Sequence, residues 1–249
     1  SFFSLVYEVR FRYKTYMKIR RSLSTFAGIY SFTYQELKKI RALESPNPEI
    51  AMGWAQGILD RINVDYQVLG EPYQGDSVLY VGNHVSYVDI PLLMGTIDRV
   101  AFVAKSQIEK WPLFGEGAAR IGTVFVKRNK SSSRDAAKKS LTQAIQNGKK
   151  VAVFPSGTTS ITGKKPWKKG AFDIAHTTNC LLQPFRLTYE PLRQTAYIDD
   201  DFFPAHLLRL TRHNSIKAKI EFHDPVRVTD PIADCEEWQA WAKPENISI

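Results

Sequence analysis

Residues 77–89 read SVLYVGNHVSYVD, in which an apolar run leads directly into a histidine and an aspartate five positions apart. The run Ser77–Gly82 has the composition of a buried strand. Loops at the ends of strands are where α/β folds place reactive groups. The stretch therefore predicts a strand that delivers His84 and Asp89 to a loop at the edge of a sheet.

The spacing of His84 and Asp89 fits a specific chemistry if the histidine lies on the turn and the aspartate on the first turn of the next helix. The carboxylate can then bind one ring nitrogen and fix the tautomer, which leaves the other nitrogen free as a base. This arrangement is a triad without its protein nucleophile, and a substrate hydroxyl would take that place. Taken alone the pattern is weak, because a histidine near an aspartate is more often structural than catalytic.

Short β-rich runs alternate with helical stretches around this motif. The predicted strands are Val64–Leu69, Ser77–Gly82, Arg99–Ala104, Thr123–Lys127, Lys150–Phe154, Leu181–Leu187, Thr195–Ile198 and Ile216–Phe222. Between two of them, Arg134 to Asn147 predicts a helix that ends at Gly148. This alternation predicts an α/β fold with a mixed central sheet flanked by helices.

The N-terminal part of the chain has a different pattern of residues. Residues 1–44 are predicted to be helical and amphipathic, because aromatic and aliphatic residues recur there at helix spacing. Basic residues crowd the first stretch, namely Arg10, Arg12, Lys14, Lys18, Arg20 and Arg21. A further helix is predicted to begin after the cap Asn47, with Pro48 at its first position. We therefore expect an N-terminal helical, membrane-associating segment, 1–62, followed by an α/β domain, 63–249. The alternative is a pair of helices that dock on the rest of the protein and leave their basic face in solvent.

The composition limits the classes of partner. The chain has 249 residues, a net charge of +9 and 43% hydrophobic residues, which favours an anionic partner such as a membrane surface or a phosphorylated substrate. No recognised nucleic-acid motif accompanies the charge, so we expect no nucleic-acid partner. No apolar run of about 18 residues is present, and we expect the chain to lie on a bilayer rather than cross it. The two cysteines and the histidines show no ligand spacing, so no metal is expected.

Further blocks follow the NHxSxxD motif in chain order. They are Phe102–Lys105 with Trp111–Gly115, Gly122–Arg128, Val153–Thr159 and Leu182–Phe185. With these blocks the chain resembles the 1-acylglycerol-3-phosphate acyltransferase family, the PlsC-like glycerolipid acyltransferases, over about residues 60–230. Each block is short, but several in the family's order are hard to obtain by chance.

The resemblance implies an O-acyltransferase of phospholipid biosynthesis. Such an enzyme moves a fatty acyl chain from acyl-CoA or acyl-carrier protein to the free hydroxyl of a lysophospholipid of the 1-acylglycerol-3-phosphate type. It implies His84 as the general base and Asp89 as its orienting partner. It implies no cofactor, since the acyl donor is a co-substrate, and a location on the cytoplasmic face of a membrane, with membrane lipids as partners.

The resemblance also assigns residues to substrate binding. Arg128 occupies the place of the family's phosphate-binding arginine, and Lys105 is the expected second cation. Ser156, Gly157 and Thr158 occupy the block written FPEGTR in the family. Backbone N–H groups near Gly157 are the expected donors to the oxyanion of the tetrahedral intermediate.

The FPEGTR block departs from the family pattern at two positions. The usual glutamate is Ser156 and the usual arginine is Thr159, so an acceptor and a phosphate-binding cation are both replaced. Two alternatives to the lysophosphatidate acceptor follow: a different lysolipid, such as an aminolipid or one with a larger head group, or a non-catalytic membrane-bound relative. The intact pair of His84 and Asp89 argues against the non-catalytic alternative. The lysines within 164–169 can replace the lost cation, although a solvated loop has the same composition.

Overall fold

The computed structural model describes residues 2–43, 47–126, 131–198 and 200–243. For residues 2–21 and 131–134 it describes the backbone alone. The predicted phosphate ligand Arg128 and the neighbouring Lys127 and Lys130 therefore lie outside the described residues.

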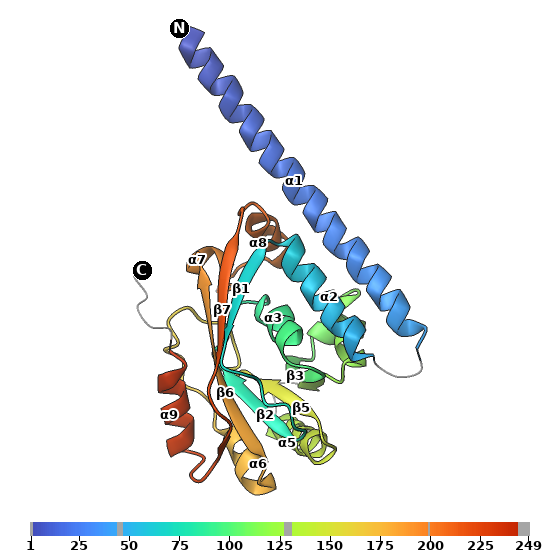
Figure 1. The fold of residues 1–249 in the computed structure, drawn as a ribbon, viewed down its shortest axis with the longest axis vertical. Coiled ribbons are helices and arrows are strands. Elements are labelled where there is room, and N and C mark those ends of the chain that lie inside the picture. The colour runs from blue at the N-terminus through green and yellow to red at the C-terminus, as the bar shows by residue number, and fades with distance from the viewer. Residues whose placement is uncertain (1, 44–46, 127–130, 199, 244–249) are drawn as a thin grey trace.

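A mixed sheet forms the centre of the molecule (Figure 1). Its strands are β1 (Val64–Leu69), β2 (Val78–Gly82), β3 (Val100–Lys105), β4 (Val124–Val126), β5 (Lys150–Val153), β6 (Leu181–Glu190), β7 (Ile216–Phe222) and β8 (Val226–Arg227). The order across the described sheet is β1-β7-β6-β2-β5-β3-β4, with β8 beside β6. The strands from β6 to β4 run parallel to one another, whereas β6 and β7 are antiparallel. The predicted fold class, an α/β fold with a mixed sheet, is confirmed.

Helices cover both faces of this sheet (Figure 1). They are α1 (Phe2–Arg41), α2 (Pro48–Arg61), α3 (Asp89–Thr96), η1 (Ile108–Lys110), α4 (Phe114–Arg120), α5 (Ser131–Gln146), α6 (Gly170–Thr178), α7 (Leu192–Thr195), α8 (Phe203–Leu210) and α9 (Ala233–Trp241). Side chains of α2, α3 and α8 fill one core, and side chains of α5, α6 and α9 fill the other. Along β2 the side chains alternate between the two cores, because successive residues of a strand point to opposite faces.

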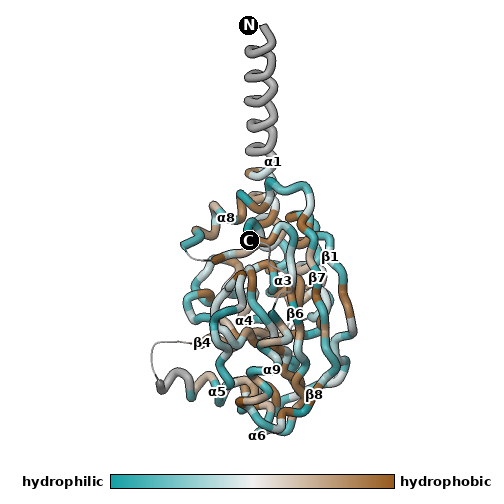
Figure 2. The backbone as a smooth tube through the Cα atoms, turned by 90° about the vertical axis from the view of Figure 1, so that its left-hand side faces the viewer, coloured by the Kyte–Doolittle hydropathy of each residue, from teal (hydrophilic) through white to brown (hydrophobic). Residues whose placement is uncertain are grey.

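Hydrophobic segments follow the strands through the body of the molecule, and hydrophilic segments are common in the connections around it (Figure 2). All five residues of β2 are buried, which fits a central parallel strand covered on both faces. This strand is the one that carries the chain to the predicted site.

The N-terminal helices pack on the α/β body through α2 and the second half of α1. Asn47 caps α2 as predicted, since its Oδ1 accepts from the N–H of Glu49 at 2.8 Å. The Trp54 indole N–H donates to Thr33 Oγ1, which joins α2 to α1. The first turns of α1 extend beyond the body (Figure 1). Within the described residues, no helix combines the length and the apolar character needed to cross a membrane.

Two of the predicted elements differ from the structure, and one short strand was missed. The run Thr195–Ile198 is not a strand, because Thr195 ends the short helix α7 and the following backbone bonds to loops instead of a ladder. The helix predicted from Arg134 begins at Ser131, so the polar serines there belong to its first turn. The strand β8, of two residues, was not predicted.

Candidate active site

The parallel strands bring the sequence motifs to one edge of the sheet. β2, β5, β3 and β4 are neighbours and run in the same direction, so their carboxyl ends lie together. His84 follows β2, Lys105 ends β3, and the run from Phe154 to Thr159 follows β5. At Gly82, the last residue of β2, a Cβ would collide with the Phe185 ring of the next strand, so glycine is needed there.

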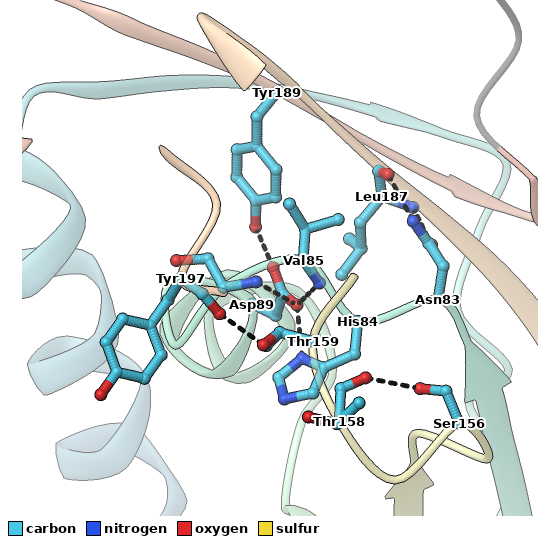
Figure 3. Close-up of polar contacts among 11 residues, drawn as sticks. Asn83, His84, Val85, Asp89, Ser156, Thr158, Thr159, Leu187, Tyr189 and Tyr197 are labelled. Atoms are coloured by element: carbon cyan, nitrogen blue, oxygen red, sulfur yellow. Dashed lines mark hydrogen bonds and ion pairs between the residues drawn. The ribbon is translucent and has the colours of Figure 1, made fainter. Parts of the chain in front are cut away.

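The predicted pairing of His84 with Asp89 is present (Figure 3). The Nδ1 of His84 lies 2.7 Å from Oδ2 of Asp89, and Asp89 is the first residue of α3, as the spacing predicted. The same Oδ2 accepts the N–H groups of Val85 at 2.7 Å and Ser86 at 3.1 Å. The Asp89 side chain is fully buried. A carboxylate that only accepts fixes the proton on Nδ1 of the imidazole.

A tyrosine from a distant strand completes the contacts of this carboxylate. The hydroxyl of Tyr189, on β6, donates to Oδ1 of Asp89 at 2.7 Å. Burial, and then the negative charge of Asp89, raise the pKa of Tyr189 well above its ordinary value, so the hydroxyl keeps its proton. Sequence reasoning missed this residue, although it continues the alternation of buried Phe185 and Leu187 along β6.

The other nitrogen of His84 is available for chemistry. Nε2 has no hydrogen-bond partner among the described residues, and the side chain is 20% exposed. The ring of Phe154 stacks on the imidazole, with centroids 3.9 Å apart and planes 12° from parallel. Phe154 packs in turn on Phe185. The imidazole is therefore held on one face by an aromatic ring and at Nδ1 by a carboxylate, which leaves Nε2 without a hydrogen-bond partner among the described residues.

The backbone around His84 is tied to two other segments. The Asn83 side chain donates from Nδ2 to the carbonyl of Leu187 at 2.8 Å, and its Oδ1 accepts the N–H of the same residue at 2.7 Å. The carbonyl of His84 accepts the N–H of Ser160 at 2.8 Å. The sequence identified Asn83 as part of a motif, and the structure shows that it fastens the histidine loop to β6.

The block that departs from the family pattern lies beside the dyad. The Ser156 hydroxyl donates to the carbonyl of Thr158 at 2.7 Å, and the Thr159 hydroxyl donates to the carbonyl of Tyr197. Gly157 has a φ of 70°, a left-handed conformation that favours glycine, and its N–H donates to the carbonyl of Phe154. The N–H groups of Thr158 and Thr159 have no acceptor within the described part of the chain.

The two predicted cations are placed differently. Lys105 is exposed at the end of β3, on the same edge as His84, with β5 between their strands. Arg128 lies outside the described residues, although the described strand before it, β4, ends at that edge. In the described ranges, no group of three or more His, Cys, Asp or Glu side chains is placed to hold a metal ion.

An apolar cavity of about 220 Å³ adjoins the histidine loop. Tyr87 and Val88, which follow His84 in the loop, form part of its wall. The remaining wall comes mainly from hydrophobic side chains of α1, α2, α3, α4 and α8. The cavity was not predicted, because it arises where these separate helices meet over one face of the sheet.

Comparison with known proteins gives the family of the chain. The sequence profile of the Acyltransferase family matches residues 63–188, which is half of the chain. A lyso-ornithine lipid O-acyltransferase from Pseudomonas aeruginosa is 31% identical over 180 residues, covering 70% of this chain and 68% of that protein. A 1-acyl-sn-glycerol-3-phosphate acyltransferase from Neisseria gonorrhoeae is 28% identical over 198 residues, covering 74% of this chain and 76% of that protein.

The fold is also found in a solved structure. The crystal structure of the 1-acyl-sn-glycerophosphate acyltransferase PlsC from Thermotoga maritima matches with a TM-score of 0.70 at 20% identity, covering 92% of this chain and 94% of that chain. From these matches, the chain belongs to the Acyltransferase family and is an acyltransferase. The resemblance drawn from the motifs is confirmed.

Proposed function

We propose that this acyltransferase moves a fatty acyl chain from the thioester of acyl-CoA or acyl-carrier protein to the free hydroxyl of a lysophospholipid. One observation carries the proposal: the imidazole of His84 has Nδ1 fixed on the buried Asp89 carboxylate and Nε2 without a partner among the described residues. A base held in this way can take the proton of a hydroxyl group that lies within hydrogen-bond reach.

The geometry supports direct attack on the thioester. Nε2 of His84 takes the hydroxyl proton as the hydroxyl oxygen bonds to the thioester carbonyl carbon. The resulting oxyanion is stabilised by backbone donors, for which the uncommitted N–H groups of Thr158 and Thr159 are the candidates, since the Gly157 N–H is used within its turn. Collapse of the intermediate breaks the carbon–sulfur bond, and the leaving thiolate takes the proton from the imidazolium. Asp89 stabilises that imidazolium while it exists.

The apolar cavity is the proposed site of the acyl chain. Its wall is almost entirely hydrophobic, and Tyr87 and Val88 connect it to the loop of His84. A chain bound there with its carbonyl near the loop would place the thioester beside the base. Burying each methylene contributes about 0.8 kcal/mol, so the cavity also provides a basis for chain selection.

The acceptor we propose is of the 1-acylglycerol-3-phosphate type, the substrate named for the relative from Neisseria gonorrhoeae. Lys105 and Arg128 would hold its phosphate, by charge pairing and, for the arginine, a bidentate contact. A second candidate is an aminolipid acceptor such as a lyso-ornithine lipid, which is the substrate named for the relative from Pseudomonas aeruginosa. The Thr159 hydroxyl favours this candidate, because it is committed to the carbonyl of Tyr197 where the family pattern has a cation.

We also propose that the chain works on the cytoplasmic face of a membrane, with the segment 1–62 at the lipid surface. Leu23 on α1 and Phe202 at the start of α8 are exposed apolar residues, and α1 and α8 contact each other. The basic composition of residues 10–21 and the net charge of +9 suit an anionic lipid surface. The same surplus charge suits the anionic acyl donors.

Acyl transfer in mixed micelles tests the proposal. The purified protein is given acyl-CoA or acyl-carrier protein and a panel of lysolipids, while thiol release and the lipid product are followed by mass spectrometry. We expect diacyl product that is lost in His84→Ala and kept in His176→Ala, a matched change at an exposed histidine of α6. Product from lyso-ornithine lipid but not lysophosphatidate would select the second acceptor. Background thiol release with every donor and acceptor would contradict the proposal.

A further inference from the structure

Among the described residues, the Asp89 carboxylate has four donors, and they divide unequally between its two oxygens. Oδ2 receives the imidazole of His84 and the two adjacent N–H groups, all from residues within five positions of Asp89 in the sequence. Oδ1 receives the Tyr189 hydroxyl, its one donor among the described residues, from 100 positions away on β6. The tyrosine therefore joins a carboxylate that is otherwise held only by its own loop to the central sheet (Figure 3).

We infer that Tyr189 is a positioning residue for acyl transfer, which orients the Asp89 carboxylate and sets the basicity of the His84 imidazole by drawing charge towards Oδ1. The inference rests on the proposed function, because it assigns a role within the same site. Hydrogen bonds to an ionised group are short and about twice as strong as neutral ones, which suits a bond of 2.7 Å to a buried carboxylate.

The direction of the effect follows from where the negative charge lies. The hydrogen bond from the Tyr189 hydroxyl stabilises negative charge on Oδ1. The attraction between the carboxylate and a protonated His84 is therefore weaker than it would be without the hydroxyl. Without the hydroxyl, more charge is available to Oδ2, and the protonated form of His84 becomes more stable. The base then loses its proton only at a higher pH, so the acidic limb of the pH–activity profile moves upwards.

Few other titratable groups contact this pair. Among the described residues, His84 and Tyr189 are the titratable side chains bonded to Asp89, and the Phe154 ring covers the imidazole. Behind the loop, the N–H of Tyr197 donates to the carbonyl of Val85. Tyr197 also packs against Tyr87 of the histidine loop, whose hydroxyl is bonded to His206 of α8. The charged groups near this contact are Asp201 and Arg209, which pair with each other. Lys105 is the cation described at the same edge of the sheet.

The test replaces Tyr189 by phenylalanine, which keeps the ring and removes the hydroxyl. Tyr80→Phe is the matched control, because Tyr80 is also a buried tyrosine of the sheet and its hydroxyl donates to the carbonyl of Tyr73. For Tyr189→Phe we expect kcat to fall about tenfold, KM to stay within about twofold, and the acidic limb to move up by about 0.5–1 pH unit. For Tyr80→Phe we expect neither the kcat nor the limb to change, at a similar loss of thermal stability.

A second variant that changes only the strength of the hydrogen-bond donor at position 189 keeps the test independent of any folding defect in the phenylalanine variant. Replacing Tyr189 by 3,5-difluorotyrosine strengthens the donor at nearly the same size, and the limb is then expected to move to lower pH. Titration of the His84 ring protons by NMR reports the same shifts without substrate. The inference is overturned if the native protein is active and both Tyr189 variants keep its acidic limb, its His84 titration and its kcat. The proposed function would then still stand. A native protein without acyl transfer would instead contradict the proposed function.

Discussion

Changing Asp89 to asparagine removes the charge of the dyad and leaves its geometry almost unaltered. Three donors converge on Oδ2, so the asparagine oxygen must occupy that position, because an NH₂ group there would face three other donors. The amide NH₂ then faces the Tyr189 oxygen, which can accept from it. The proton therefore stays on Nδ1 of His84, and Nε2 remains the base.

The expected loss is therefore the electrostatic stabilisation of the imidazolium. Nδ1 and Oδ2 are 2.7 Å apart, which puts the centres of the two charges about 4 Å from each other. At an effective dielectric constant of about 20, such a pair interacts by about 4 kcal/mol. The imidazole carries between about half and all of a full charge in the transition state, so about 2–4 kcal/mol is lost. This corresponds to a fall in kcat of about 30-fold to 1,000-fold.

The assay measures kcat and KM for thiol release with a saturating acyl donor, beside a thermal unfolding curve for each protein. A folded Asp89→Asn protein with a strongly reduced kcat and a nearly unchanged KM is the expected result. If kcat falls less than about threefold while the protein stays folded, the charge of Asp89 does not assist the base, and the proposed role of the dyad is wrong.

Two further predictions concern the cavity and the stability of the fold. Gly117 lines the apolar cavity, and a Cβ there would meet no atom within 4 Å, so the ring of Gly117→Phe should fill part of the space. We expect kcat/KM to fall about fourfold for each methylene of the acyl chain that is displaced. Equal losses for short and long acyl donors would contradict the assignment of the cavity to the acyl chain. Burial lowers the pKa of His206 below its ordinary 6.5, so in acid the unfolded chain binds a proton that the folded chain resists. The urea midpoint is therefore expected to fall as the pH drops below 6.5, and to fall less in His206→Gln; a flat native curve from pH 7 to 5 would refute this.

The parts of the site that were predicted from the sequence are those set by local geometry. His84 and Asp89 are five positions apart, and a strand followed by a turn and a helix leaves few ways to arrange them. The meeting of the motifs at one edge was not predicted, although it follows once the strands are known to be parallel, because their carboxyl ends coincide. The prediction of the pair needed no knowledge of the contacts between distant segments.

The parts that were missed depend on tertiary contacts. Tyr189 reaches Asp89 only because β6 pairs with β2 in the register that sets Phe185 beside Gly82. Thr195–Ile198 has the composition of a strand, but the Tyr197 backbone is bonded to Val85 and Thr159 instead of a neighbouring strand. The cavity is formed by helices that are far apart in the sequence. No local pattern records any of these three contacts.

The side chain of Asn83 takes the place of a backbone in the sheet. The ladder between β2 and β6 ends where Gly82 meets Phe185, yet the side-chain amide of Asn83 supplies a donor and an acceptor to the backbone of Leu187, two residues further along β6. The chain can thus end the strand and turn towards α3 while it stays hydrogen-bonded to β6. The proposed base, which follows directly, is thereby anchored to the core of the sheet, and such anchoring opposes the local fraying of a surface loop. A loop held in this way can keep a proton acceptor within the few tenths of an ångström that transfer to and from a lipid hydroxyl demands.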